Sequence, residues 1–409
     1  MADPRTIVER ELGRVDVRPF TLDTFHSRRE RTRRNQRLAA GAVGVSIALA
    51  IAVVASQLLD VNRDRTAGRS FENGVIAFEG NRGLFLSNAD GTGSHAVLRS
   101  VPDPPGECLS DSEHPCDYRG LAWSPDGKQL AFVFGEISAG LFGDMSLYVM
   151  DATTEDVRLL ASCPDEPRDE AGTCDNGSRL SWSPDASRLV FSSGADLFVA
   201  DTRTGELTQI TGCASCAYLG LARYPGWSPS GDWIVFSGAD SIGVVSPDGA
   251  RSQMVERSSD TSIDIVNGSR AEWSPDGARL VFPTNRGIFV VRADGSALRL
   301  LVGEQFGEAP GSPSWSPDGQ RIVYVNTPNT TDGYSIVIRS VDLDGTQDRL
   351  IYRDCCVYDW GGPVYSPDGS QITFSVGLDD SFGVFVMTAA GNDVQRLPGY
   401  GEPACQALP

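Results

Sequence analysis

The pentapeptide Trp-Ser-Pro-Asp-Gly restricts the fold of this chain more than any other feature, because the sequence repeats it. Three complete copies and three near-copies begin at Trp123, Trp182, Trp227, Trp273, Trp315 and Tyr365. The steps between them are 59, 45, 46, 42 and 50 residues, in the range of propeller-type repeats. Proline presets φ at the second position of a β-turn, and glycine at the fourth accepts a positive φ. Each copy therefore predicts a tight turn between two strands.

A regular set of strands surrounds each turn. A short apolar strand follows it, as in Leu130–Phe132, and then a second strand, as in Leu147–Met150. The second strand ends in an Asp/Gly turn such as Ala293–Gly295, and a more polar third strand follows, as in Leu298–Leu301. Together with the strand that carries the tryptophan, each repeat has four strands, which is the content of one propeller blade.

This pattern resembles the TolB-type, WD-like β-propeller repeat over about residues 71–409. The resemblance implies an all-β propeller of four-stranded blades and a role in envelope interactions. The last three strands of the repeat occur seven times, the first set beginning at Val75–Phe78, whereas the tryptophan-bearing strand occurs six times. Gly401–Cys405 is similar to Gly362–Tyr365, with Cys405 in place of the aromatic residue. We therefore predict seven blades, the first completed by the C-terminal strand; six blades are the alternative.

The N-terminal part has a different composition. No charged residue occurs among the 22 residues from Leu38 to Leu59, and a helix of that length spans ~33 Å, enough for a hydrocarbon core of ~30 Å. Six arginines between Arg28 and Arg37 precede it, which places the N-terminus in the cytoplasm. We predict a cytoplasmic tail (1–37), a transmembrane signal anchor (38–59), a linker (60–70) and the propeller (71–409). A signal peptide cleaved after Ala55 is the alternative.

Eight of the nine cysteines form local pairs between the last strand of one blade and the first strand of the next. The pairs are Cys108 with Cys116, Cys163 with Cys174, Cys213 with Cys216, and Cys355 with Cys356. In an oxidising compartment such pairs predict disulfides, whereas the Cys-x2-Cys spacing of the third pair also fits a metal site that lacks two ligands. The adjacent Cys355 and Cys356 leave three states open: a vicinal disulfide, bonds to other cysteines, or free thiols. Cys405 is predicted to be a buried free thiol.

The connections between blades repeat least, which makes them the predicted binding face. They are residues 101–120, 162–180, 212–226 and 353–362, and the loops 135–144 and 326–334 open on the same face. Long, individual loops on a rigid scaffold commonly bind partners. Their aromatic and arginine residues, of types enriched at binding hot spots, are Tyr218, Arg223, Tyr358 and Trp360. The alternative is that these side chains pack their own loops.

Charge and motifs exclude several classes of function. The net charge is −19, with +4 in residues 1–37 and −23 in the rest, so nucleic acid is repelled. The sequence has three histidines and no hydrolase, P-loop, Rossmann or zinc-protease motif, and no catalytic, metal or cofactor site is predicted. We expect a membrane-anchored extracytoplasmic scaffold that binds a protein or an envelope component. The alternatives are a transmembrane sensor whose tail binds a sigma factor, and an enzyme or glycan binder that uses the central channel.

Overall fold

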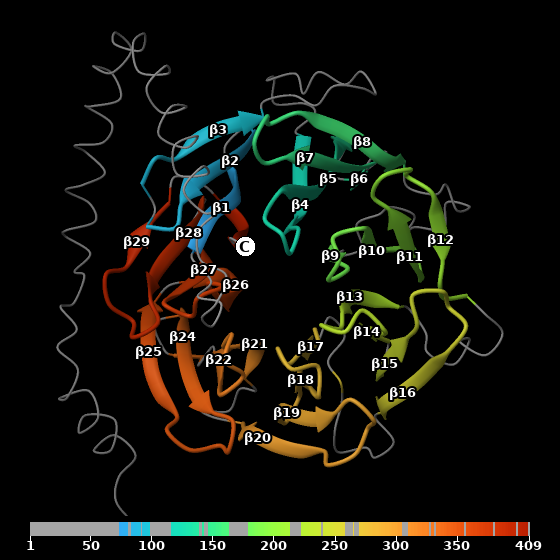
Figure 1. Cartoon of the computed structure of the whole chain (residues 1–409). Coiled ribbons are helices and arrows are strands. Elements are labelled where there is room, and N and C mark those ends of the chain that lie inside the picture. Colours follow the sequence, from blue (N-terminus) through green and yellow to red (C-terminus); the bar gives the residue numbers. More distant parts are fainter. Residues whose placement is uncertain are drawn as a thin grey trace, which may run out of the picture. The chain divides into compact units, whose positions relative to one another are not determined.

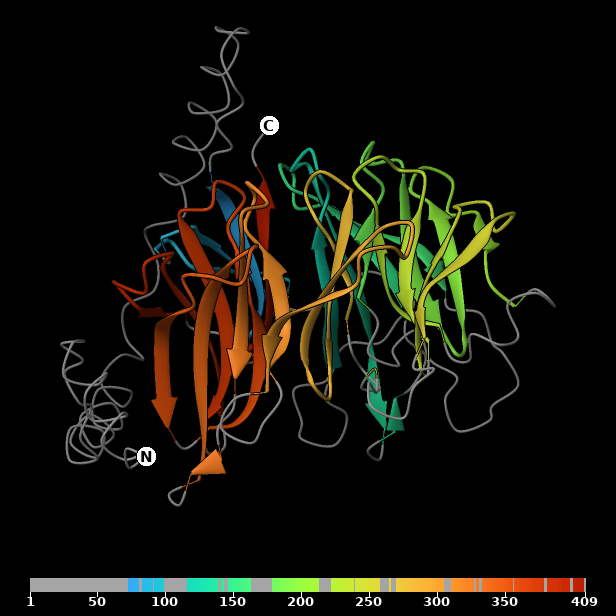
Figure 2. The ribbon, with the colours of Figure 1, turned by 90° about the horizontal axis from the view of Figure 1, so that it is seen from below.

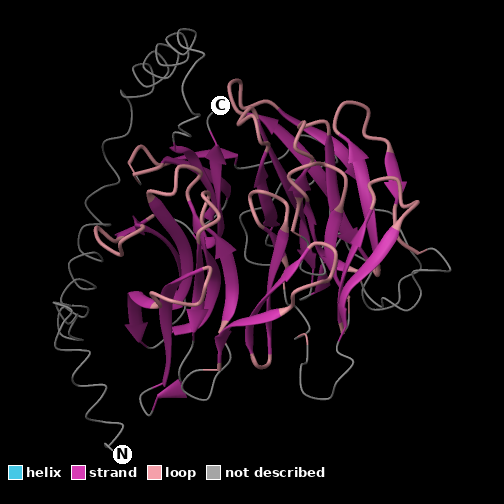
Figure 3. Cartoon of the chain, turned by 60° about the horizontal axis from the view of Figure 1, so that its bottom comes forward, coloured by secondary structure: helices cyan, strands magenta, loops and turns pink. Residues whose placement is uncertain are grey.

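A computed structural model describes residues 73–80, 83–90, 92–98, 116–138, 141–142, 146–162, 179–212, 222–238, 240–257, 265, 270–304, 310–326, 329–330, 333–355, 357–378, 381–397 and 400–407. The chain forms two compact units, Met1–Arg69 and Ser70–Pro409, and all described residues belong to the second. These residues are strands and turns (Figure 3), and none of them forms a helix able to cross a membrane. The predicted tail, anchor and linker lie outside them.

Seven antiparallel sheets stand around a central axis (Figure 1), and we number these blades from the N-terminus. Blade 1 contains β30 (Tyr400–Ala407), β1 (Asn73–Gly80), β2 (Gly83–Asn88) and β3 (His95–Leu98). Blade 2 contains β4 (Cys116–Trp123), β5 (Gln129–Ser138), β6 (Leu141–Phe142), β7 (Ser146–Asp151) and β8 (Val157–Ser162). Blade 3 contains β9 (Ser181–Trp182), β10 (Arg188–Ser193), β11 (Asp196–Asp201) and β12 (Leu207–Gln209).

The remaining four sheets have the same strand order. Blade 4 contains β13 (Arg223–Trp227), β14 (Ile234–Ser237), β15 (Ser241–Val245) and β16 (Ser252–Arg257). Blade 5 contains β17 (Glu272–Trp273), β18 (Arg279–Thr284), β19 (Gly287–Arg292) and β20 (Arg299–Gly303). Blade 6 contains β21 (Gly311–Trp315), β22 (Arg321–Asn326), β23 (Asn329–Thr330), β24 (Gly333–Asp342) and β25 (Arg349–Cys355). Blade 7 contains β26 (Val357–Tyr365), β27 (Gln371–Leu378), β28 (Ser381–Thr388) and β29 (Gln395–Arg396). The prediction of seven blades is confirmed, and the alternative of six is wrong.

The ring closes between the two ends of the propeller, as predicted. β30 pairs antiparallel with β1, and Ile76 lies opposite Cys405. In blade 2, Leu130 lies opposite Trp123 in the same way. Cys405 therefore occupies the register position of the tryptophan. The pairing also covers the inner edge of β1, where the first and last strands of the propeller meet.

Hydrogen bonds within each Ser-Pro-Asp turn explain why the motif repeats. Ser183 Oγ donates to the Asp185 carboxylate at 2.6 Å and accepts the backbone N–H of Arg188 at 2.9 Å. The bonds from Ser183 and then Ser187 hold the pKa of Asp185 at about 2. The corresponding serines that donate to an aspartate in the same way are Ser124, Ser274, Ser316 and Ser366. Each turn thus satisfies its own polar groups and starts the next strand in a fixed direction.

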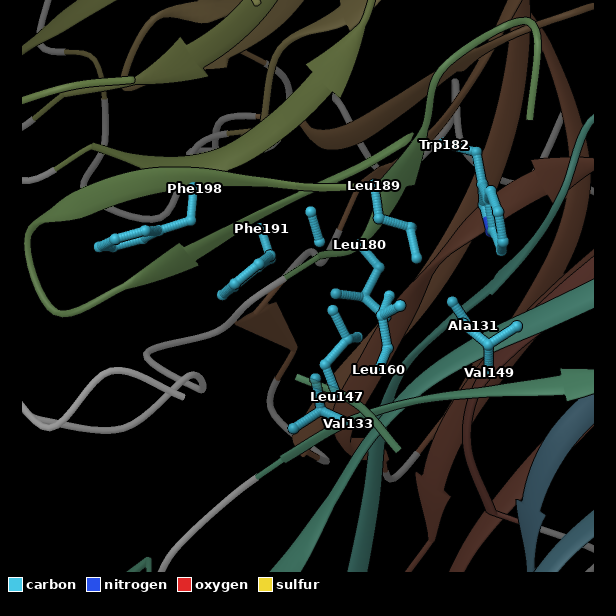
Figure 4. Packing of buried hydrophobic residues seen from close by; sticks show 11 residues of the cluster. Ala131, Val133, Leu147, Val149, Leu160, Leu180, Trp182, Leu189, Phe191 and Phe198 are labelled. Carbon is cyan, nitrogen blue, oxygen red and sulfur yellow. The ribbon is translucent and has the colours of Figure 1, made fainter. Parts of the chain in front are cut away.

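The hydrophobic core is divided into seven clusters, one between each pair of neighbouring blades. Leu189 and Phe191 pack between blades 2 and 3 together with Trp182 (Figure 4), whereas Val190 between them packs toward blade 4. Successive residues of a strand point to opposite faces of its sheet. A strand buried on both faces is therefore apolar throughout, which accounts for the short apolar runs in the sequence.

The blades differ in height on one side of the ring. The hairpins β5–β6 and β23–β24 extend blades 2 and 6 beyond their neighbours (Figure 2). The described strands of blades 3, 4 and 5 have at most six residues, whereas β27 and β28 of blade 7 have eight each. The predicted loops 135–144 and 326–334 are thus largely hairpin, because cross-strand pairing continues past the apolar run. The predicted loop 353–362 is wrong for the same reason, since β25 and β26 cover nearly all of it.

Candidate functional site

The first strand of each blade faces the axis of the ring (Figure 1), and two of these strands carry an arginine in the same register. In β13, Gly226 lies opposite Val235, but Arg223 lies opposite Ser237, so the strand contains one extra residue. In β4, a similar irregularity places Arg119 opposite Val133. In both strands the β-bulge places the residue four positions before the tryptophan opposite the residue three positions after the partner of the tryptophan.

Blades 3 and 5 carry arginines just before their short inner strands. Arg179 and Arg270 each stand three residues before the tryptophan of their blade, Trp182 and Trp273. Four consecutive blades therefore carry an arginine on the inner strand or directly before it. Those residues are Arg119, Arg179, Arg223 and Arg270.

Glu272 joins two of these arginines across the centre of the ring. Its Oε1 accepts a hydrogen bond from Arg179 Nη1 at 3.1 Å and a second one from Arg270 Nη2. Arg179 belongs to blade 3 and Glu272 to blade 5, and β13 of blade 4 lies between their strands in the ring. The ion pair must therefore pass along the axial side of β13, which begins with Arg223. We refer to Arg179, Arg223, Arg270 and Glu272 as the axial cluster.

Burial makes the charges of the axial cluster strongly interacting. The side chain of Glu272 is 13 % exposed, that of Arg270 23 % and that of Arg179 38 %. Burial alone would raise the pKa of Glu272, but the charges and hydrogen bonds of Arg270 and Arg179 lower it below its ordinary value. The Nε atoms of Arg223 and Arg270 are also buried, and neither has a hydrogen-bond partner among the described residues. The axial cluster thus combines an ionised carboxylate with an excess of guanidinium donors.

Of the four residues predicted to bind a partner, the structure gives the strand positions of three. Arg223 was expected in a connecting loop, but it is the first residue of β13, because the bulge extends strand pairing to it. Tyr358 and Trp360 lie in β26, where long pairing with β27 replaces the expected loop. Tyr218 lies outside the described residues.

The cysteines predicted to form disulfides fall mostly outside the described part of the chain. Cys116 begins β4 and Cys355 ends β25. The other six lie outside the described residues: Cys108, Cys163, Cys174, Cys213, Cys216 and Cys356. Neither member of the second pair, Cys163 with Cys174, is described, and the same holds for the third, Cys213 with Cys216.

No predicted pair therefore has both members described, and no disulfide is shown. The four disulfides stay predictions, as does the free thiol of Cys405, for which the structure gives only the place in β30. The metal alternative for Cys213 and Cys216 likewise lies outside the described residues. Among those that are described, no group of three or more His, Cys, Asp or Glu is placed to hold a metal ion.

Sequence reasoning found Arg223 but missed Arg179, Arg270 and Glu272. A comparison of the repeats position by position contains the signal for Glu272. It directly precedes the tryptophan of its repeat, where the other copies have Ala122, Ser181, Gly226, Ser314 and Val364. The arginines are harder to find, because Arg119 and Arg223 stand four residues before their tryptophan, whereas Arg179 and Arg270 stand three residues before theirs.

No protein-family model matches the chain, and no curated protein matches it either. Among solved structures, an oligogalacturonate lyase in complex with manganese is 16% identical, with a TM-score of 0.52 over 81% of this chain and 86% of that one. An oligogalacturonate lyase from Vibrio parahaemolyticus is 14% identical, with a TM-score of 0.50 over 80% and 85%. TolB from Acinetobacter baumannii is 17% identical, with a TM-score of 0.47 over 85% and 88%. The resemblance to TolB predicted from the repeat is thus found again among the structures, and at these identities it extends to the fold alone.

Proposed function

We propose that this protein is a membrane-anchored, extracytoplasmic scaffold without catalytic activity that binds another protein or an envelope component. The binding face is the one from which the hairpins β5–β6 and β23–β24 project. These hairpins are the observation that carries the proposal (Figure 2). Blades 3, 4 and 5 complete the same ring with described strands of at most six residues, so the fold does not require the extra length. Projecting elements on a rigid scaffold are typical binding elements.

The antiparallel order of the strands supports assigning the variable connections to this same face. In an antiparallel four-stranded blade, the turn after the second strand and the connection after the fourth strand leave from the same end of the sheet. The connections with the predicted disulfides, and Tyr218 among them, lie outside the described residues; in the proposal they belong to the same binding face. Tyr358 and Trp360 stand near the beginning of β26, at this end of blade 7. In the proposed arrangement, residues 38–59 anchor the chain, and residues 1–37 lie in the cytoplasm.

In-cell crosslinking of the tagged full-length protein, followed by mass spectrometry, tests the proposal. One variant replaces Ile137–Phe142, the tip of the β5–β6 hairpin, with Asn-Gly, and a second shortens β23–β24 likewise. The control changes the exposed Arg203 and Glu206, on the turn between β11 and β12 at the opposite face, to serine. We expect an envelope or secreted protein to be enriched with the wild type and the control and lost with a hairpin variant.

Two outcomes would contradict this function. A partner that is retained when both hairpins are shortened does not use the proposed face. A cytoplasmic transcription regulator that is lost on deletion of residues 1–37 would instead make the protein a sensor. Thermal unfolding of each variant verifies that the ring is intact.

A further inference from the structure

We propose that the axial cluster binds a small ligand with a carboxylate or phosphate group at the centre of the ring. Arg179, Arg223 and Arg270 would supply the donors, and Glu272 would orient two of them. This site goes beyond the proposed scaffold function, because it uses the inner strands of blades 3, 4 and 5 instead of the hairpins of blades 2 and 6.

The ring itself does not require these charges. At the register position of Arg119 and Arg223, the inner strands of blades 6 and 7 carry glycines. These are Gly311, opposite Val325, and Gly361, opposite Ser375. At the position of Glu272, blade 6 carries Ser314. Blades with small uncharged residues therefore pack as well as blades with the charged ones. The propeller fold by itself therefore does not account for four charged residues on or just before three neighbouring inner strands.

The hydrogen-bonding capacity of the cluster exceeds what Glu272 uses. A guanidinium group has five N–H donors, and Arg270 gives one of them, at Nη2, to Glu272 Oε1. The buried Nε atoms of Arg223 and Arg270 find no acceptor among the described residues. A buried charged donor without an acceptor is unfavourable, and a carboxylate or phosphate matches the fork of donors on arginine.

The negative charge of the whole chain contrasts with the local excess of arginine in the axial cluster. The net charge of −19 repels anions from most of the surface, so a small anion is attracted only where arginines outnumber carboxylates. Among the described residues of the axial cluster, two arginines pair with Glu272, and Arg223 adds a third guanidinium group. The Glu272 carboxylate competes with a bound anion for Arg179 and Arg270. Removal of its charge should therefore tighten anion binding.

The competing explanation is purely structural: the ion pair ties blade 3 to blade 5. It accounts for Arg179, Arg270 and Glu272, but it gives Arg223 no role. The two explanations differ most clearly for Glu272→Gln. If the ion pair is only structural, Glu272→Gln lowers the unfolding stability and the protein binds no anion. If the cluster is a ligand site, Glu272→Gln binds the anion more tightly than the wild type does.

Isothermal titration of the full-length protein at low ionic strength, with citrate and separately with inorganic phosphate, tests the proposal. Arg223→Gln leaves both bonds to Glu272 in place, and the matched control Arg203→Gln makes the same charge change on an exposed turn. We expect saturable binding that Arg223→Gln weakens by about tenfold, the loss of one charge-assisted hydrogen bond. Arg203→Gln should leave the affinity unchanged, and Glu272→Gln should increase it by roughly threefold or more.

Binding of either anion supports the proposal, and the ratio of the two affinities shows whether the site prefers carboxylate or phosphate. The proposal is overturned if neither anion binds the wild type at about 10 mM, an affinity too weak for a built site. It is also overturned if Arg223→Gln and Arg203→Gln bind equally well. Thermal unfolding of the variants in the same buffer shows whether a lost signal reflects loss of the fold.

Discussion

Blades 3, 4 and 5 differ from blades 6, 7, 1 and 2 in how their strands reach along the axis of the ring. The inner strands β9 and β17 have two residues each, whereas β26, β30 and β4 have nine, eight and eight. The long inner strands pair with their own blades over most of that length. The first group of blades is therefore the short side of the ring, and the second is the tall side.

Side chains also connect the inner strands of neighbouring blades, both within the short side and where it meets the tall side; Trp315 of blade 6, for example, donates to the carbonyl of Glu272 at 3.2 Å. The indole Nε1 of Trp182 donates to the carbonyl of Ala122 at 2.9 Å, and that of Trp273 donates to Gly226 at 3.0 Å. Ser181 Oγ accepts the backbone N–H of Trp227 at 3.0 Å. The same repeat thus varies in two ways around the ring. Longer strands on the tall side form a projecting face, and shorter inner strands on the short side leave space near the axis for charged side chains.

Removal of β30 is the most severe test of the tall side. A chain that ends before Tyr400 leaves β1 without its inner partner and opens the ring between blades 7 and 1. We expect a loss comparable to the whole stability of a domain, about 5 kcal/mol or more, in urea unfolding. The control ends after Ala407 and keeps β30 complete. Equal stability of the two truncated chains would mean that β30 does not close the ring.

On the short side, Glu272→Gln should have the next largest effect. The exchange removes a carboxylate that is 13 % exposed and leaves Arg179 and Arg270 without their counter-ion, a loss of about 1–3 kcal/mol in unfolding free energy. The matched change is Glu155→Gln, which breaks the exposed pair between Glu155 and His95 at 3.6 Å on the tall side. Such exposed pairs contribute less than about 0.5 kcal/mol. Equal effects of the two exchanges would contradict the difference between the sides.

The contribution of Glu272 should also depend on pH with a definite sign. Its pKa is lower in the folded protein than its ordinary value of 4.5, despite burial, because of Arg270 and Arg179. A lowered pKa stabilises the fold above the pKa of the unfolded state, and this stability is lost as the pH falls through the folded value. The difference in stability between wild type and Glu272→Gln should therefore be constant near neutral pH and shrink below about pH 4.5.

The sequence was sufficient for the repeated parts of this architecture and insufficient for the exceptions. The six turn motifs and the similarity of Gly401–Cys405 to Gly362–Tyr365 predicted the seven blades and their closure, since turn chemistry and alternating burial act locally. The bulge next to Tyr224, which has a φ of 53°, results from pairing with β14 and has no comparable local signal. The contact of Arg179 with Glu272, 93 residues later, depends on the whole ring.

The tryptophans of blades 3 and 4 allow a finer comparison within the short side. Trp182 and Trp227 are 6% and 7% exposed, but only the Trp182 indole has a hydrogen-bond acceptor among the described residues. Both exchanges to phenylalanine lose similar packing, and only Trp182→Phe also leaves the Ala122 carbonyl without its donor. We expect Trp182→Phe to be about 1 kcal/mol more destabilising in urea unfolding. A larger loss with Trp227→Phe would assign the main role of these residues to packing alone.

The smallest predicted effect concerns the Trp-Ser-Pro-Asp turn of blade 3, which has alanine where blades 4 and 5 have glycine. Ala186 has a φ of 58°, where blade 4 has Gly231 with a φ of 78°. A side chain in this left-handed conformation is strained, and glycine removes the strain. The greater flexibility of glycine in the unfolded chain offsets part of this gain, so Ala186→Gly should stabilise by about 0.5 kcal/mol. The reverse exchange, Gly231→Ala, should destabilise by a similar amount through backbone strain, since its new Cβ meets only Pro184, with Cδ at an ordinary 3.6 Å and Cγ at 3.8 Å. If thermal unfolding shows a loss for Ala186→Gly, the contact of its methyl group with the cluster between blades 2 and 3 outweighs the backbone strain.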